Sequence, residues 1–378
     1  MRLLMLVCAF ALTLTGARAE AQGQGGGVTR TYYIAADDVI WDYAPTGKDE
    51  ITGQPFNAFQ AYFAEASDYR LGRKLKKALY LEYSDATFTK RKARPPEWEH
   101  LGWLGPLIRA EVGDTIRVVF KNNTQFPASM HPHGVFYEKD SEGALYRDGT
   151  EGAMKADDAV PPGGSHTYKW VVPERAGPVP GGPSSAFWMY HSHSSETRDF
   201  FTGLVGPMII TARGQASENS LRPKDVDREF IVAFMSTEEA SSWYAEDNIR
   251  RDLGRPSEAK IVHDQFGSWN IATPKDTTVE AKDNMNGFIY GNLPMLTMKR
   301  GERVRWYLMT GAGFEVHAPH WHGNTGIEGH MRVDTVSLTT MGMTQIDMIP
   351  DAVGTWLFHC HVNAHMDAGM IARYQVLP

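Results

Sequence analysis

Trp356-Leu-Phe-His-Cys-His361 matches Trp188-Met-Tyr-His-Ser-His193 in one register: tryptophan, apolar, aromatic, histidine, one variable residue, histidine. A second pair precedes each copy, because His320-Trp-His322-Gly resembles His131-Pro-His133-Gly in the same way. Such self-similarity indicates that a chain is built from two units of one architecture. The 378 residues are enough for two domains, each with its own core.

Short runs of β-branched and aromatic residues predict strands in both units, and no stretch of comparable length keeps a helical period well. The clearest runs are Thr115-Ile-Arg-Val-Val-Phe120, Glu229-Phe-Ile-Val-Ala-Phe234, Val304-Arg-Trp-Tyr-Leu308 and Ile371-Ala-Arg-Tyr-Gln-Val376. The 36 glycines and 21 prolines suit a chain rich in turns. We expect an all-β protein of two antiparallel sandwiches or barrels.

Composition divides the chain into segments. Residues 1–21, with an apolar run after Met1-Arg2 and small-residue cleavage sites, predict a secretory signal peptide, and residues 22–29 a flexible leader. The polar stretch 214–227 predicts a linker between a first domain, 30–213, and a second, 228–378. We therefore expect an exported protein, periplasmic or secreted, with no membrane span.

Charge and cysteine content exclude several classes of protein. The formal net charge is −7, from 38 Lys+Arg against 45 Asp+Glu, so nothing favours nucleic-acid binding. Two cysteines rule out a disulfide scaffold. Cys8 lies inside the expected signal peptide, which leaves Cys360 as the cysteine of the mature chain.

Ten of the 14 histidines fall into four short motifs, which indicates metal binding. The four outside the motifs are His100, His166, His263 and His330. One thiolate (Cys360), two imidazoles (His317 and His365) and a thioether (Met370) form the His₂Cys set with a weak axial methionine that is typical of blue copper. A structural zinc site would contain more thiolates and no thioether, although Met370 could also be ordinary core.

The eight other clustered histidines form four His-x-His pairs without a carboxylate or a thiol, which is enough for three coppers. Residues i and i+2 of a strand face the same side, so His359 and His361 should point away from Cys360. One strand segment would then connect the thiolate site to a second metal site.

These motifs resemble the copper signatures of multicopper oxidases in order and spacing. Flanking text such as Ser242-Trp-Tyr-Ala-Glu-Asp-Asn-Ile249 and Lys76-Lys-Ala-Leu-Tyr-Leu-Glu-Tyr83 is similar to the ceruloplasmin and hephaestin branch. The presence of only two domains also resembles the small laccases. The resemblance implies two cupredoxin-like Greek-key β-sandwich domains and four coppers per chain equivalent.

The resemblance also implies a role for each ligand. A type 1 copper would lie between His317, Cys360, His365 and Met370, in the second domain only, because Ser192 replaces the cysteine in the first. A type 2 copper would bind His131 and His320, and a type 3 pair would bind His133, His191, His193, His322, His359 and His361. Electrons from a reducing substrate would enter at type 1, and dioxygen would be reduced to water at the three-copper cluster.

Half of the cluster ligands lie in each domain, so by the same resemblance we expect a homotrimer, in which each cluster joins two chains. Oxygen reduction needs protons, and Glu142 and Tyr137 are the candidates near the first histidine motif. Each could equally be a loop or packing residue.

Two classes of reducing substrate fit the sequence. Ceruloplasmin-like flanks suggest a metal-ion oxidase such as a ferroxidase, with Glu315 and Asp334 as candidate carboxylates near type 1. Small-laccase architecture suggests phenols or other organic donors, and Asp334 could be a structural hydrogen-bonding residue.

Two other classes of protein share part of this pattern. A copper nitrite reductase is also a two-domain trimer, but the pattern of that family has its blue copper in the first domain and fewer histidine pairs. A non-enzymatic copper-binding or electron-transfer module is disfavoured because all twelve expected ligands are present.

Overall fold

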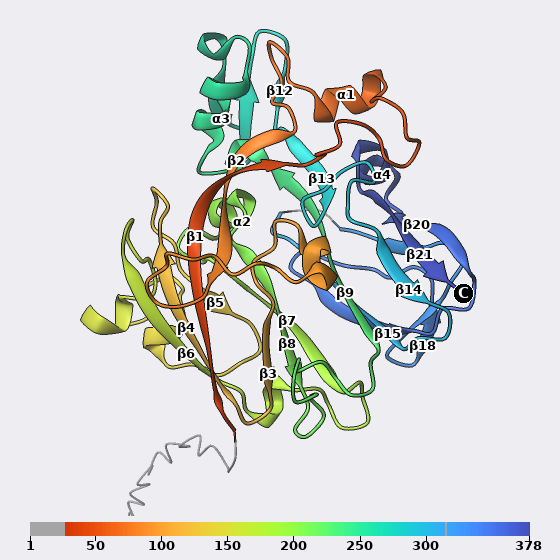
Figure 1. The fold of residues 1–378 in the computed structure, drawn as a ribbon. Coiled ribbons are helices and arrows are strands. Elements are labelled where there is room, and N and C mark those ends of the chain that lie inside the picture. The colour runs from red at the N-terminus through yellow and green to blue at the C-terminus, as the bar shows by residue number, and fades with distance from the viewer. Residues whose placement is uncertain (1–26, 266, 314–315) are drawn as a thin grey trace, which may run out of the picture.

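The computed structural model describes residues 27–265, 267–313 and 316–378, and it shows two β-sandwiches packed against each other (Figure 1). The expected signal peptide with Cys8, residues 22–26 of the leader, and Glu315 lie outside the described residues. The all-β, two-cupredoxin prediction is confirmed, while the domain boundaries remain a prediction.

The first sandwich consists of two four-stranded sheets, in the orders β2-β1-β4-β6 and β3-β8-β7-β5. Apolar residues of β1, β2, β4 and β6 pack against residues of β3, β7 and β8 to form its core. The strands are β1 (Thr29–Asp42), β2 (Lys74–Tyr83), β3 (Ile108–Glu111), β4 (Thr115–Asn122), β5 (His131–Pro132), β6 (Ser165–Val171), β7 (Ser185–His191) and β8 (Val205–Thr211).

The second sandwich pairs a six-stranded sheet, β13-β9-β15-β19-β17-β18, with a four-stranded sheet, β14-β21-β20-β16. Its core lies between these two sheets. The strands are β9 (Arg228–Glu238), β13 (Ala281–Met285), β14 (Leu296–Lys299), β15 (Val304–Thr310), β16 (Pro319–Trp321), β17 (Gly326–Glu328), β18 (Met331–Val333), β19 (Met343–Met348), β20 (Gly354–Cys360) and β21 (Ile371–Leu377).

Short helices and one small sheet lie outside the sandwiches. The α-helices are α1 (Ala58–Ala64), α2 (Glu196–Thr202), α3 (Ala245–Asp252) and α4 (Asn363–Ala368), and the small sheet contains β10 (Lys260–His263), β11 (Trp269–Ala272) and β12 (Thr277–Thr278). Short 3₁₀ helices span Pro96–Leu101, Lys139–Ser141, Gly152–Lys155, Glu174–Ala176, Glu239–Ser241 and Pro256–Glu258. Within the described ranges, no helix is both long and apolar enough to cross a membrane.

Strand pairing is mixed, so the expectation of purely antiparallel sheets was wrong. β1 pairs parallel with β4 and β3 with β8, and the second sandwich repeats this with β9–β15 and β14–β21. The chain crosses from one sheet of a sandwich to the other and then returns to the original sheet. Such crossovers permit parallel neighbours, which hairpins do not. The repeated pairing supports the common architecture read from the sequence.

A third apolar core joins the two sandwiches. Along β9, Phe230, Val232 and Phe234 face the core of the second sandwich, whereas Ile231 and Ala233 face the core between the sandwiches. This alternation is the period of two of a strand. It explains why the run 229–234 is apolar on both faces, as expected for a strand covered on both sides.

Two buried ion pairs cross the same interface. Lys77 Nζ lies 2.7 Å from Glu239 Oε1, and Arg109 Nη2 lies 2.5 Å from Glu229 Oε2. Removing one member of a buried pair leaves an uncompensated charge, at a cost of about 3–5 kcal/mol. The two sandwiches are therefore fixed to each other by polar as well as apolar contacts.

Residues 43–73, here called the strap, leave the first sandwich between β1 and β2 and pack on the second. Glu50 N donates to Tyr290 O at 2.9 Å, and Lys282 Nζ donates to Phe63 O at 2.8 Å. Figure 1 shows α1, which belongs to the strap, close to α4. The sequence division placed the strap in the first domain and did not anticipate these contacts.

His100, one of the histidines outside the motifs, lies at the domain interface. Its Nε2 accepts a hydrogen bond from Ile231 N at 3.2 Å, and its ring lies between Trp98 and Phe230. Burial lowers the pKa of His100 from 6.5 to about 4. The side chain is therefore neutral at pH 7 and serves as an acceptor.

This depressed pKa predicts a loss of stability in acid. The stability that His100 provides is complete above pH 6.5 and is lost as the pH falls toward 4, because the unfolded chain takes up the proton first. The difference approaches about 3 kcal/mol at pH 4. His100→Gln keeps an acceptor but does not titrate, so in metal-free protein its urea unfolding should depend less on pH between 7 and 4. Equal pH dependence of the two proteins would contradict this reading.

Candidate functional site

A thiolate group forms at the end of β20. Cys360 Sγ lies 3.9 Å from His317 Nδ1 and 3.7 Å from His365 Nδ1, and all three residues are buried. Met370 is also buried, and its backbone carbonyl accepts a hydrogen bond from Cys360 N at 3.1 Å. β20 thus presents the sulfur, α4 presents His365, and the loop before β16 presents His317.

The spacing of these three ligand atoms fits one metal ion. Bond lengths of about 2.0 Å to nitrogen and 2.3 Å to sulfur, at an angle of about 120°, place the two ligand atoms about 3.7 Å apart. The observed separations of 3.9 and 3.7 Å are close to this value. The donor set, one thiolate and two imidazoles, is the set that copper prefers in electron-transfer sites.

Two further groups contain only imidazoles. The first histidine group lies at the ends of β5 and β7, and the second at the ends of β16 and β20. Cross-strand pairing sets both, with His131 opposite His191 and His320 opposite His359. The members are His131, His133, His191 and His193 in the first group and His320, His322, His359 and His361 in the second.

Equivalent ring nitrogens of the two histidine groups lie at the same distance from each other. His133 Nε2 lies 3.1 Å from His191 Nε2, and His322 Nε2 lies 3.1 Å from His359 Nε2. Two nitrogens at this distance can share one ion with bonds of about 2.0–2.1 Å. His320, His322 and His359 also bring their ring nitrogens within 4.8 Å of one another.

Backbone carbonyls orient one imidazole of each group, that of His131 in the first and that of His320 in the second. Nδ1 of His131 donates to Glu142 O at 2.7 Å, and Nδ1 of His320 donates to Asp334 O at 2.9 Å. A carbonyl can only accept, so Nδ1 carries the proton and the Nε2 lone pair is left for a metal.

The imidazoles of His191 and His359 are oriented in the same way. His191 Nδ1 donates to Ser192 O at 3.0 Å, and His359 Nδ1 donates to Cys360 O at 2.9 Å. The second of these contacts ties the backbone of the thiolate ligand directly to a histidine of the second group.

Burial keeps several of these imidazoles neutral. It lowers the pKa of His317 to about 3 and that of His133 to about 4, with neighbouring histidines adding to the effect. Burial also lowers the pKa values of His131, His191, His322 and His359. A neutral imidazole offers its lone pair to a metal without first losing a proton.

The two histidine groups are separate within this chain. Ring contacts connect the members of each group, and across the part of the chain that the structure describes no ring contact joins one group to the other. Each group leaves rings partly exposed. Leu145, whose amide donates to His193 O at 3.3 Å, is 54% exposed beside the first group.

The predicted proton donors lie near the first histidine group. The Tyr137 ring is 5.8 Å from the His131 ring, and the Glu142 carbonyl is the acceptor for His131. The Glu142 carboxylate, however, contacts Lys139 Nζ and accepts from Tyr146 Oη at 3.0 Å. Their roles in turnover remain predictions.

The carboxylates predicted near the thiolate are placed differently. Asp334 lies beside His320, through its backbone carbonyl, and its side chain accepts from Thr335 Oγ1 at 3.2 Å. Glu315 lies outside the described residues. Sequence reasoning missed Glu196, whose carboxylate is 3.3 Å from His193 Nε2; its place three residues after a ligand motif was the available signal.

The other histidines outside the motifs contact different partners. His166 Nε2 is 2.8 Å from Asp140 O, and the His263 ring packs on Trp269 at 3.9 Å. His330 is exposed. Among the described residues, neither His166 nor His263 contacts the thiolate or histidine groups.

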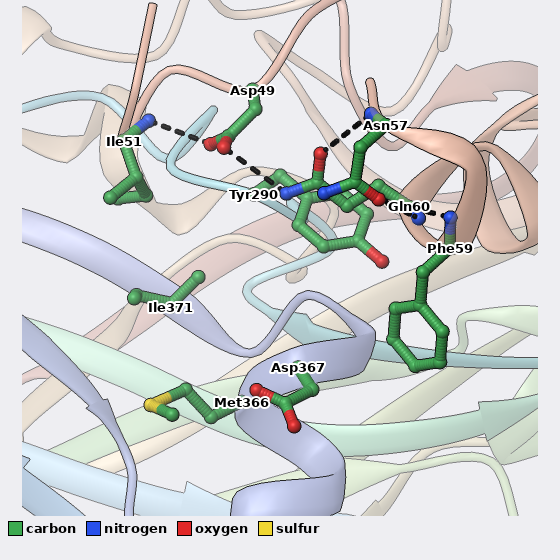
Figure 2. Close-up of a pocket in the computed structure, with 9 residues that line it drawn as sticks. All are labelled: Asp49, Ile51, Asn57, Phe59, Gln60, Tyr290, Met366, Asp367 and Ile371. Carbon is green, nitrogen blue, oxygen red and sulfur yellow. Dashed lines mark hydrogen bonds between the residues drawn. The ribbon is translucent and has the colours of Figure 1, made fainter. Parts of the chain in front are cut away.

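A pocket of about 360 Å³ opens beside α4, between the strap and the second sandwich. Figure 2 shows Asp49, Asn57 and Gln60 of the strap on one side and Met366 and Asp367 of α4 on the other. Met366 and Asp367 directly follow His365 in α4, so this helix carries both a residue of the thiolate group and part of the pocket lining.

Comparison with known protein families gives matches in both halves. Models described as multicopper oxidase match residues 100–215 and residues 255–378.

Curated relatives match nearly the whole chain. It is 42% identical to hephaestin of Rattus norvegicus over 355 residues, 93% of this chain and 30% of hephaestin. It is 40% identical to ceruloplasmin of Homo sapiens over 362 residues, 93% of this chain and 33% of ceruloplasmin. Ferroxidase HEPHL1 of Mus musculus is 40% identical over 357 residues, 93% and 29% of the two chains. The chain spans about a third of the length of these relatives.

Solved structures share the fold. A multicopper oxidase named mgLAC superposes with a TM-score of 0.56 at 20% identity, covering 92% of this chain and 86% of that one. A blue copper oxidase from Nitrosomonas europaea gives a TM-score of 0.55 at 18% identity, with coverage of 92% and 86%.

The thiolate group predicts a selective effect of Cys360→Ser. A serine hydroxyl does not replace a thiolate as a copper ligand, so the variant should bind one copper fewer per chain. The intense thiolate-to-copper absorption should vanish, while copper bound by the histidine groups remains. Metal analysis together with visible spectroscopy measures both quantities. A variant that keeps the absorption band would show that Cys360 is not the ligand.

Proposed function

Because this chain belongs to the multicopper oxidase family, with two cupredoxin domains, we propose that it couples one-electron oxidation of a reducing substrate to the four-electron reduction of dioxygen to water. The observation that carries the proposal is the position of Cys360, which faces His317 and His365 while its carbonyl accepts from His359. One residue thus contacts both kinds of metal-binding group.

We assign the ligands to the copper sites as the motifs predict. His317, Cys360, His365 and Met370 form the type 1 site. His131 and His320 supply the type 2 site, and His133, His191, His193, His322, His359 and His361 supply the type 3 pair. When bound, copper provides the one-electron couples that pass electrons to dioxygen. The protein holds the imidazoles neutral, orients them through carbonyls and excludes water from the thiolate.

The three-copper cluster requires two chains in this proposal. Each chain carries one half of the cluster in its first histidine group and the other half in its second. The rings that each histidine group leaves partly exposed are consistent with burial of this surface by a second copy. A head-to-tail interface that closes on itself gives a ring, and we propose a homotrimer.

Ferrous iron is the reducing substrate that we propose. The relatives include a protein named ferroxidase, and the pocket beside α4 contains carboxylates. Burial is the main cause that raises the pKa of Tyr290, which lines this pocket. The negative charges of Asp283, Asp49 and Asp367 raise this pKa further, so three carboxylates lie close enough to influence the Tyr290 hydroxyl. Negative charge in a pocket beside α4, the helix that carries His365, favours a cationic donor.

An organic donor is the second candidate. Ile51, Phe59 and Ile371 give the same pocket an apolar part, which suits a phenol or an aromatic amine.

Oxygen uptake by copper-loaded protein tests the function and the donor together. Ferrous ion, cuprous ion and a phenol are supplied in parallel, and ferrous ion should give the largest kcat/KM. No uptake with any donor would contradict oxidase activity. Faster turnover of the phenol would favour the organic donor.

The pocket itself is tested with Asp367→Asn. Loss of one carboxylate should raise the KM for ferrous ion several-fold with little change in kcat, because only binding of the cation is weakened. Asp351→Asn, an exposed aspartate of the same domain, is the matched control. Equal KM values for the three proteins would separate Asp367 from the donor site.

Complementation tests whether a cluster joins two chains. His133→Ala disables the first histidine group and His322→Ala the second, so each variant alone should be inactive. After random assembly at equal amounts, the intact first group of one chain meets the intact second group of another at about one quarter of all interfaces. Co-refolding at equal amounts should therefore restore activity in that proportion.

A cluster formed within one chain would give no activity in any mixture. Light scattering on the same samples checks the mass of the assembly, and a monomer that consumes oxygen would contradict the trimer.

A further inference from the structure

Ser192 occupies the position in the first sandwich that Cys360 occupies in the second. Ser192 N donates to Leu204 O at 3.0 Å, as Cys360 N donates to Met370 O at 3.1 Å. Ser129 N donates to Ser192 Oγ at 3.0 Å, as Ala318 N donates to Cys360 Sγ at 3.3 Å. The two sites share one backbone frame, although the first has no thiolate or thioether.

A buried carboxylate lies beside Ser192. Asp199, in α2, is fully buried and accepts hydrogen bonds from Ser192 Oγ at 2.6 Å and Ser195 N at 2.8 Å. It also accepts from Trp243 Nε1, which the second half of the chain supplies, at 2.7 Å. All three partners are donors, so an ionised carboxylate, which only accepts, satisfies them.

The contacts of Ser129 extend this network to the first histidine group. Ser129 Oγ accepts from His193 N at 2.9 Å and donates to Gly143 O at 2.6 Å. Gly143 follows Glu142, whose carbonyl orients His131. Ser192 itself provides the carbonyl that orients His191.

Trp243, which donates to Asp199, makes two further contacts that stabilise the network. Its ring stacks on Phe126 at 5.1 Å and 9°, and its backbone amide donates to Thr202 Oγ1 at 2.9 Å. Phe126 lies in the loop that leads to Ser129. The segments before β5, after β7 and within α2 are therefore held by one set of buried contacts.

We propose that Ser192 and Asp199 are positioning residues that fix the first histidine group before metal binds, in place of the metal and thiolate that order the matching frame of the second sandwich. The proposal rests on the proposed function, because it assigns a purpose to half of the three-copper cluster. Second-layer hydrogen bonds of this kind typically change metal affinity or activity by about 10–100-fold.

Two variants test the proposal. Ser192→Ala removes one hydroxyl, and Asp199→Asn replaces an acceptor-only group with one that also donates. Ser185→Ala is the matched control: Ser185 is equally buried on β7, and its hydroxyl bonds to Tyr307 Oη and Arg305 rather than near the histidines. If Asp199→Asn does not fold, Ser192→Ala carries the test with its milder change.

The first measurement uses metal-free protein. Amide hydrogen exchange of residues 129–134 and 191–196 should rise about tenfold in both variants and stay at the wild-type rate in Ser185→Ala. Wild-type exchange in Ser192→Ala would overturn the proposal, as would an equal rise in the control.

The second measurement is copper loading. The thiolate-to-copper absorption, which belongs to the second sandwich, should match wild type in both variants. The paramagnetic resonance of type 2 copper should need about 10–100 times more free copper to appear. Full loading at wild-type copper concentrations would overturn this inference alone, whereas a wild type that binds only the thiolate-coordinated copper would overturn it together with the proposed function.

Discussion

The alternation of side chains along β20 is the constraint on which the metal-binding region depends. A strand turns successive residues to opposite faces, so Cys360 enters the core of the second sandwich while His359 and His361 face the second histidine group. The His359 ring then returns to the backbone of Cys360 through its Nδ1. Two sites of different chemistry are thereby held one residue apart, with no mobile segment between them.

The two sandwiches share one backbone arrangement around their histidine groups but place different side chains at the position of Cys360. Cross-strand pairing, imidazole pairs at 3.1 Å and carbonyl acceptors recur in both. At the position of the thiolate, the first sandwich has a hydroxyl held by a buried carboxylate. A metal ligand and a hydrogen-bonded network are alternative ways to satisfy the same buried backbone, since either one must leave no polar atom without a partner.

The interface between the sandwiches explains how one chain can carry two separated half-sites. β9 and β15 bury one face in the second sandwich and the other face against the first, and the ion pairs Lys77–Glu239 and Arg109–Glu229 lie in the same interface. Such an interface leaves little freedom for the sandwiches to rotate. The histidine groups therefore keep the directions in which the fold points them, and the strap adds a wall to the pocket beside α4.

The sequence by itself determined the repeat, the all-β class and the grouping of the ligands, because the motifs are local and strand periodicity is short-range. His359-Cys360-His361 could be assigned to two faces from spacing alone. Tertiary structure decided the parallel strand pairs, the position of Asp334 beside His320, the contact of Glu196 with His193 and the buried site of Asp199. It also decided that the strap covers the second sandwich and that His100 is a neutral acceptor at the interface. These features join residues far apart in the chain or depend on burial, and no local pattern records which distant surfaces exclude water from a side chain.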